Sequence, residues 1–180
     1  MGFSLRKATL EDEAAIASVI AASVRGLARG FYDEREIELS IRSVFGVDRD
    51  LIDDGTYFVA VGDDGSVVGG GGWSRRKTLY GASTYESSRD AAFLDPTTDT
   101  AKIRAFFVHP DAARQGIGRA ILEACEIEAR SAGFRSAEMM ATLPGVPLYS
   151  VCRYERGETV DIPIGDGRHI KCIRMSKELK

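Results

Sequence analysis

The sequence predicts a single α/β domain in which a mixed β-sheet carries helices on its faces. Apolar residues recur every three or four positions in some stretches and alternate in others, in the order β-α-α-β-β-β-α-β-α-β-β. The chain has 180 residues, of which 44% are hydrophobic and 28% charged. This length suits one domain with a full core and is too short for two comfortable ones. We therefore expect residues 1–180 to form one domain without internal repeats or flexible linkers.

The first part of the chain is predicted to hold one strand and two helices. "SLRKA" (residues 4–8) is a short strand candidate, and Thr9 to Asp12 resembles a capping box with Asp in place of Glu or Gln. The helix that starts there has an apolar face at helical spacing and Gly30 as its stop: Ile16, Val19, Ile20, Val24 and Leu27. A second helix is expected between Asp33 and Gly46, with three residues pointing inward: Ile37, Ile41 and Val44.

The middle of the chain predicts an antiparallel hairpin and then a long irregular segment. "TYFVAVG" (residues 56–62) and "SVVGGGGWS" (residues 66–74) alternate on either side of the turn "DDG". The glycines at 69–72 favour a bulge or close packing, with room for a ligand as the alternative. Residues 75 to about 100 lack clear periodicity and predict a polar loop. Long loops in compact domains are often functional, so we expect substrate specificity there.

The remaining elements follow in quick succession. "KIRAFFV" (residues 102–108) predicts a central strand, "RSAEMMAT" (135–142) another, and "GVPLYSVC" (145–152) a short helix. "TVDIPI" (159–164) and "HIKCIRM" (169–175) predict a terminal hairpin around "GDG". Between the first two strands lies a helix closed by Gly133, with four residues along one line and two more beside it: Ile117, Ile121, Ala124 and Glu128, then Ala120 and Cys125.

The triplet Gly116-Ile117-Gly118 lies between the central strand and this helix. A dinucleotide fold requires a third glycine where Ile121 stands, and a Walker loop requires Lys and Ser or Thr where Arg119 and Ala120 stand. What remains is an anion site made of backbone N–H groups and the helix dipole, flanked by Arg114 and Arg119. A tight turn without a ligand is the alternative.

Composition argues against several other classes of protein. The net charge of −3 and a pI near 5.5 argue against general nucleic-acid binding. No apolar run is long enough to cross a membrane, and "MGFSLRKATL" lacks the apolar centre of a signal peptide, so we expect a soluble, cytoplasmic protein. Three scattered cysteines and two histidines predict neither a disulfide framework nor a metal site.

The order of elements, together with "FFVHPDAARQGIGRAIL" and "TLPGVPLYSVCRY", resembles the GCN5-related N-acetyltransferase (GNAT) family over nearly the whole chain. The resemblance implies a mixed, mostly antiparallel sheet with helices on both faces and acetyl-CoA as co-substrate, with no metal. Its acetyl-CoA motif falls on six consecutive residues: Ala113, Arg114, Gln115, Gly116, Ile117 and Gly118. Ala113 departs from the family's Arg or Gln, and Arg114 or Arg119 can supply that charge.

The resemblance also assigns residues on the strand and on the short helix. It implies that Phe106, Phe107 and Val108 line the pantetheine arm of the co-substrate, with core packing as the alternative. Thr142 stands where the family often has Asn. Leu148-Tyr149 matches an apolar-Tyr pair, whereas Arg153-Tyr154 replaces the family's Gly-Phe.

Amide formation needs a neutral amine, a donor for the oxyanion and an acid for the departing thiolate. In this reading Tyr149 is the acid and the backbone N–H of Val108 or a neighbour is the donor. Glu138 is the candidate general base, against the alternatives of a solvated strand residue, a water chain or an amine that arrives partly deprotonated. His109 fits a surface turn better than a catalytic role.

We therefore expect an enzyme that moves an acetyl group from acetyl-CoA to a primary amine by direct attack in a ternary complex. A non-catalytic acetyl-CoA sensor on the same fold is the alternative, and a longer-chain acyltransferase differs only in the volume of the acyl pocket. The acceptor is a small molecule or a peptide, with polyamine, antibiotic, amino acid and protein N-terminus all open. We expect no nucleic-acid or membrane partner, and the chain is compatible with a homodimer.

Overall fold

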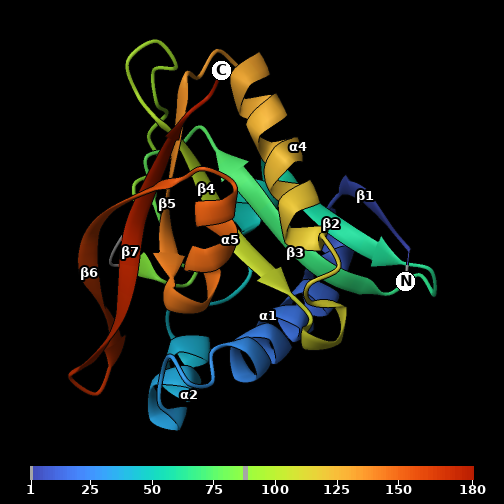
Figure 1. The fold of residues 1–180 in the computed structure, drawn as a ribbon, viewed down its shortest axis with the longest axis vertical. Coiled ribbons are helices and arrows are strands. Elements are labelled where there is room, and N and C mark those ends of the chain that lie inside the picture. The colour runs from blue at the N-terminus through green and yellow to red at the C-terminus, as the bar shows by residue number, and fades with distance from the viewer. Residues whose placement is uncertain (1, 87–88) are drawn as a thin grey trace.

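The computed structural model describes residues 2–86 and 89–180 and forms a seven-stranded sheet flanked by helices (Figure 1). The sheet order is β1-β2-β3-β4-β5-β7-β6, and only β4 and β5 pair in parallel. The strands are β1 (Phe3–Lys7), β2 (Tyr57–Gly62), β3 (Val67–Ser74), β4 (Ala101–Val108), β5 (Ser136–Thr142), β6 (Glu155–Gly165) and β7 (Arg168–Glu178). The helices are α1 (Glu13–Leu27), α2 (Glu34–Arg42), α3 (Arg49–Asp53), α4 (Ile117–Ser131) and α5 (Val146–Val151). The mixed, mostly antiparallel sheet with helices is confirmed.

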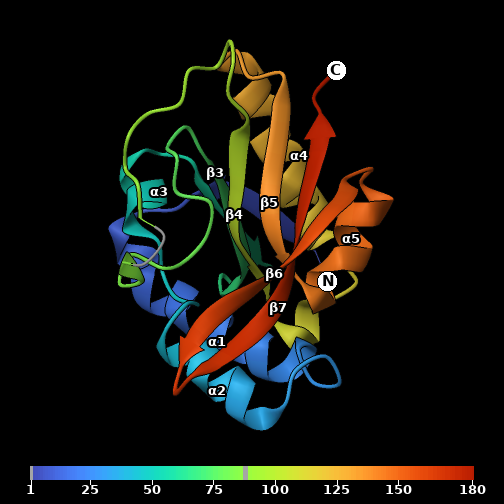
Figure 2. The same cartoon turned by 90° about the vertical axis from the view of Figure 1, so that its left-hand side faces the viewer.

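The two faces of the sheet carry separate apolar clusters because successive strand residues point to opposite sides. Tyr57 and Val59 of β2 pack with α1 and α2, whereas Phe58 and Ala60 pack in the cluster that holds α4 and α5. Figures 1 and 2 show α1 and α2 gathered at one end and α4 running beside β3. Helices therefore cover both faces, as the sequence predicts.

The glycines of β3 allow close packing, and they lie opposite an irregularity in β4. The β3–β4 register shifts between Gly70 and Gly72, and Ala105 of β4 has a φ of +56°. A Cβ on Gly70 would lie 2.7 Å from the Tyr57 hydroxyl oxygen, and one on Gly71 would lie 2.6 Å from the Phe106 ring. The glycines thus leave the space in which the β4 bulge forms, rather than the space for a ligand.

The strands β4 and β5 separate soon after they begin. Their paired residues are Ala101 with Ala137 and Lys102 with Glu138, and no later pair is present in the described strands. Figure 1 shows β4 and β5 diverging below this start, with α5 beside the opening. The edge of β4 beyond Lys102 therefore lacks a strand neighbour on that side and borders a split in the sheet.

The segment from residue 75 to 100 contains no α-helix or regular strand in its described part, and residues 87–88 lie outside the described residues. The sequence predicts a polar loop here, but Thr78, Ala82 and Tyr85 are buried. Thr78 holds the returning chain by exchanging hydrogen bonds of 3.0 Å with the backbone of Asp90. The segment therefore packs against the rest of the protein and is not a fully solvated loop.

One local expectation needs correction, because the sequence pattern missed α3, which is only five residues long. On α4, Ala124 is partly buried and packs against the core cluster, and Glu128 accepts a 2.9 Å hydrogen bond from the buried Trp73 indole. The buried residues of α4 are Ile117, Ile121, Leu122, Cys125 and Ala129. At the start of α1, by contrast, the Thr9 N–H donates to the Asp12 carboxylate at 2.9 Å, as the capping box predicts.

Candidate active site

Two cavities lie in the split between β4 and β5, and several residues line both of them. The outer cavity has a volume of about 160 Å³ and the inner cavity about 70 Å³. Both are lined by the same five residues: Phe45, Phe106, Phe107, Thr142 and Tyr149. The two cavities therefore meet at Tyr149 and the bulged part of β4.

The outer cavity reaches the N-terminus of α4. Gly116 has a φ of +86° and Arg114 a φ of +65°, so the chain turns through two left-handed residues before the helix. The N-terminus has no side-chain cap, and its first intrahelical bond runs from Ala120 N–H to the Gly116 carbonyl at 3.0 Å. The preceding N–H groups are thus free of intrahelical partners and suit an anion.

Gly118 lines the outer cavity and brings α4 close to α5. A Cβ added there would lie 2.8 Å from the Leu148 side chain, closer than real Cβ atoms approach other carbons. The Val108 side chain lies 4.0 Å from the same point. Glycine is required here by packing, whereas Gly116 has open space around it and is required by its backbone angle.

The other residues of the acetyl-CoA motif have distinct positions. Ile117 is buried in the core, so only its backbone can face a ligand, and Ala113 is half-buried. Arg114 and Gln115 are exposed in the turn, and the Gln115 amide donates to the Asp111 carbonyl at 3.2 Å. Arg119 is exposed and lines a separate groove along α4.

The free edge of β4 faces α1. The Val108 N–H donates to the Ser23 hydroxyl at 3.3 Å, and the next N–H, that of His109, donates to Val68 of β3 at 2.8 Å. Strand alternation therefore points the N–H of Phe106 to the same open side as that of Val108. Because the N–H of Val108 already has a protein partner, Phe106 is the better oxyanion donor of the two.

Tyr149 is buried at the junction of the cavities. Its ring packs edge-on against Phe106, with ring centres 6.2 Å apart, and against Tyr154 at the same separation. The hydroxyl has no hydrogen-bond partner among the described residues. Burial raises the pKa of Tyr149 above its ordinary value, so the phenol stays protonated at neutral pH.

Glu138 does not line either cavity, although it is buried. It forms an ion pair with Lys102 and accepts a 2.7 Å hydrogen bond from the Arg174 guanidinium. Burial raises the pKa of Glu138, but the bonds and charges of Lys102 and Arg174 outweigh burial and lower it overall. Its geometry is that of an ion-pair cluster where β4 and β5 pair, and it does not suit a general base.

The inner cavity contains residues that sequence reasoning missed. Arg104 of β4 lines it together with Met139 and Met140 of β5 and Phe45 from the segment after α2. Strand alternation could have predicted that Arg104 follows Lys102 on one face of β4. No sequence signal connects this strand with residues 44–46 and 79–82, which form the opposite wall.

Several other features bear on the expected class. Among residues 2–86 and 89–180, no helix is both long and apolar enough to span a membrane. The same residues include no cluster of His, Cys, Asp or Glu suited to a metal ion. Cys125, Cys152 and Cys172 are free thiols, and the His109 ring accepts a 3.3 Å hydrogen bond from the Asp111 N–H in a surface turn.

Solved structures with the same fold span nearly the whole chain. A GCN5-related N-acetyltransferase from Rhodopseudomonas palustris matches with a TM-score of 0.72 at 20% identity, covering 99% of this chain and 97% of that one. The PaiA N-acetyltransferase of Thermoplasma acidophilum, in complex with coenzyme A, matches with a TM-score of 0.63 at 15% identity and 99% coverage of both chains. The protein YncA of Salmonella typhimurium, with its cofactor acetyl-CoA, matches with a TM-score of 0.64 at 17% identity, covering 100% and 95%.

Sequence comparison identifies the family independently of these folds. No curated protein matches the chain. The family model described as "Acetyltransferase (GNAT) family" matches residues 22–152, which is more than half of the chain and includes β4, α4 and α5. The chain therefore belongs to the GNAT acetyltransferase family.

Proposed function

We propose that the protein transfers an acetyl group from acetyl-CoA to a primary amine by direct attack in a ternary complex. The observation that carries this proposal is the outer cavity, which is lined both by Gly118 in the uncapped first turn of α4 and by Tyr149, a residue that also lines the inner cavity. Two structural relatives hold coenzyme A or acetyl-CoA, which supports the same co-substrate here. The family membership supports acyl transfer in general.

The residues of the outer cavity fit a phosphorylated thioester of this kind. Backbone N–H groups at the start of α4 and the helix dipole suit a diphosphate. Gly118 lets α4 pack closely against α5 at the wall of the cavity, since a side chain there would meet Leu148. Phe106, Phe107 and Val108 form an apolar wall whose strand edge has no strand neighbour, which suits an arm containing amides.

In the proposed reaction each residue has a limited task. Acetyl-CoA supplies an activated acyl group, so the protein must orient the amine, stabilise charge on oxygen and protonate the thiolate. The Phe106 N–H is the proposed oxyanion donor. Tyr149 is the proposed acid, because burial keeps its hydroxyl protonated at the junction of the cavities. An amine that arrives partly deprotonated, or a water chain, removes the need for a side-chain base.

A screen of amines with thiol detection tests the proposal. Purified protein is mixed with acetyl-CoA and with polyamines, aminoglycosides, amino acids or peptides, and free CoA is measured against time. Release of CoA that depends on one amine class, with an acetylated product of matching mass, supports transfer. Tight binding of acetyl-CoA without release for any class would contradict it and favour a non-catalytic acetyl-CoA sensor.

A further inference from the structure

Arg104 is a buried cation in the wall of the inner cavity, and two of its donor nitrogens are unused. The residue is 4% exposed. Its Nη2 donates to the Gly81 carbonyl at 2.8 Å and forms an ion pair with Asp48 whose angles are not those of a hydrogen bond. Nε and Nη1 are buried without a hydrogen-bond partner among the described residues. Two nitrogens of Arg104 are therefore available as hydrogen-bond donors at the wall of the inner cavity, which Tyr149 also lines.

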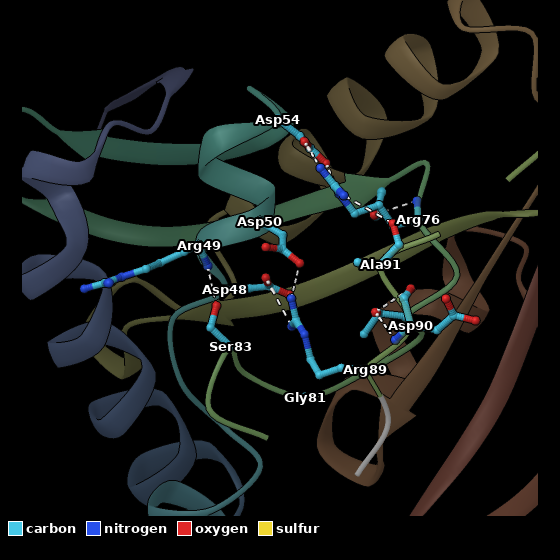
Figure 3. Close-up of polar contacts among 12 residues, drawn as sticks. Asp48, Arg49, Asp50, Asp54, Arg76, Gly81, Ser83, Arg89, Asp90 and Ala91 are labelled. Atoms are coloured by element: carbon cyan, nitrogen blue, oxygen red, sulfur yellow. Dashed lines mark hydrogen bonds and ion pairs between the residues drawn. The ribbon is translucent and has the colours of Figure 1, made fainter. Parts of the chain in front are cut away.

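Arg104 belongs to a cluster of four charged side chains whose charges cancel. Asp48, which precedes α3, also lies 3.5 Å from Arg89 of the long segment, and Arg89 forms a second ion pair with Asp50 of α3. Figure 3 shows Arg89 reaching toward Asp48 and Asp50. Two carboxylates and two guanidinium groups form this cluster. Their contacts hold Arg104 in place against the cavity from behind.

The cavity itself has one charged side chain. Among its described lining residues, Arg104 is the only ionic group, and the rest are apolar, aromatic, hydroxyl-bearing or glycine. A buried N–H without a partner is costly, and an oxygen atom of a ligand would satisfy it. Carboxylates match the guanidinium fork best, whereas a second cation at this place would be repelled. The site therefore favours an acceptor that carries an anionic oxygen pair.

We propose that the acceptor amine bears a carboxylate on the neighbouring carbon, as in an α-amino acid, and that Arg104 binds this carboxylate. This inference rests on the proposed acetyl transfer. The inner cavity of about 70 Å³ suits a compact acceptor or the compact end of one. Bound in this way, the carboxylate occupies the Arg104 side of the cavity while the amine remains free to face Tyr149 and the β4 bulge. Polyamines lack the carboxylate and should be poor acceptors.

Matched acceptors test the inference on the unmodified protein. Leucine, leucinamide and isoamylamine differ only at the carboxyl position, as do serine, serinamide and ethanolamine. Initial rates of CoA release should give a kcat/KM for at least one acid about 100-fold above its amide and its decarboxylated amine, since a buried donor left unpaired disfavours the analogue. The amide has the less basic amine and more of it is neutral, so intrinsic reactivity favours the opposite order.

Variants assign the preference to Arg104. D48N/R104Q removes both charges of the pair, so neither is left buried alone, and should reduce the preference to within about threefold while the Kd for acetyl-CoA is unchanged. R76Q is the matched control, because Arg76 pairs with Asp54 at 2.7 Å from the same segment but does not line the cavity. R76Q should keep the wild-type preference. Thermal unfolding and acetyl-CoA binding show whether each variant is folded.

The outcomes separate this inference from the proposed function. Acetylation of amines and amides as fast as acids would overturn the carboxylate inference and leave acetyl transfer intact. A preference that survives in folded D48N/R104Q would overturn the role of Arg104. If no amine of the wider screen leads to release of CoA, both proposals are overturned. If the double variant fails to fold, the wild-type ratio of acid to amide still decides the substrate class.

Discussion

The outer and inner cavities are built in different ways. The outer cavity takes its proposed anion site from one stretch of chain, residues 114–118, and its wall from α1, β4 and α5. The inner cavity takes its wall from residues 44–46, 79–82, 103–107 and 139–149, and its one charge from Arg104. The proposed anion site thus depends on backbone geometry that is encoded locally. The inner cavity depends on side chains that only the fold brings together.

This difference explains which functions each end can perform. Backbone N–H groups recognise a phosphate whatever the neighbouring side chains are, so Ala113 can depart from the family motif without removing the site. Side chains at the inner end can be exchanged one by one, so this end is suited to selecting the acceptor. Tyr149 and the β4 bulge lie between the ends and serve both.

The largest effect is expected at the junction. Y149F keeps the ring and its packing against Phe106 and Tyr154 but removes the proposed acid. Single-turnover acetyl transfer should slow by about 100-fold or more, the scale of general acid catalysis. The Kd for acetyl-CoA and the melting temperature should change little, since the hydroxyl has no partner among the described residues.

The pH profile is the control for Y149F. Because burial raises the pKa of Tyr149, its hydroxyl stays protonated above the ordinary tyrosine pKa. The wild-type rate should therefore not decrease as the pH is raised to about 10. At lower pH the rate should rise as the amine loses its proton. Wild-type speed for Y149F in a single turnover would reduce this tyrosine to a packing residue.

A second variant changes the outer cavity alone and should weaken the binding of acetyl-CoA. G118D places a side chain against Leu148, 2.8 Å from the new Cβ, and an anion beside the N-terminus of α4. Loss of charge-assisted bonds of about 1.5–3 kcal/mol should raise the KM for acetyl-CoA about tenfold to 100-fold. G118A crowds Leu148 without the charge and separates the two causes. An unchanged KM in folded G118D would exclude this glycine from the co-substrate site.

A smaller effect is expected from the support beneath the bulge. The buried Tyr57 hydroxyl donates to the Ala105 carbonyl at 2.9 Å, where φ is +56°. Y57F removes this bond, which should lower the free energy of unfolding by about 1 kcal/mol and slow turnover by up to about tenfold through displacement of β4. Y85F is the matched control, because it removes the hydroxyl of another buried tyrosine, which donates to the Pro163 carbonyl at 3.1 Å and lines neither cavity. Equal rates for wild type and Y57F would show that the bulge holds its shape unaided.

No effect is expected from chelators at either end. The described residues contain no set of ligands for a metal, and the proposed reaction needs none. EDTA should therefore leave both the rate and the melting temperature unchanged. Loss of activity that added metal restores would contradict the mechanism.

The same difference governs what the sequence could predict. Periodicity predicted the sheet and most helices. Gly116 and Gly118 predict an anion site at the turn before α4, and the uncapped helix N-terminus found there is compatible with it. The role of Arg104 could not be predicted, because it depends on contacts with Gly81 and Asp48, far away in the sequence. The short helix α3 was missed for the same reason. The acidic residues in and beside α3 pair with arginines of other segments: Asp48, Asp50 and Asp54 (Figure 3).

Glu138 shows the limit of reading residue types alone. A lone carboxylate in a strand is a reasonable candidate base, but its partners Lys102 and Arg174 come from β4 and β7. Strand register decides this, since Glu138 lies opposite Lys102 at the last paired position before the split. The sequence contained all three charges and could not indicate that they meet.

Hydrogen exchange on binding of coenzyme A tests the two-ended account most directly. Mass spectrometry of the full chain, with and without coenzyme A, reports protection of backbone N–H groups by segment. The account predicts slower exchange in residues 106–108 and 117–119 and no change in 79–82 until an amino acid acceptor is added. Protection confined to residues 151–157, along the separate groove that Arg119 lines, with β4 and the start of α4 unchanged, would contradict it.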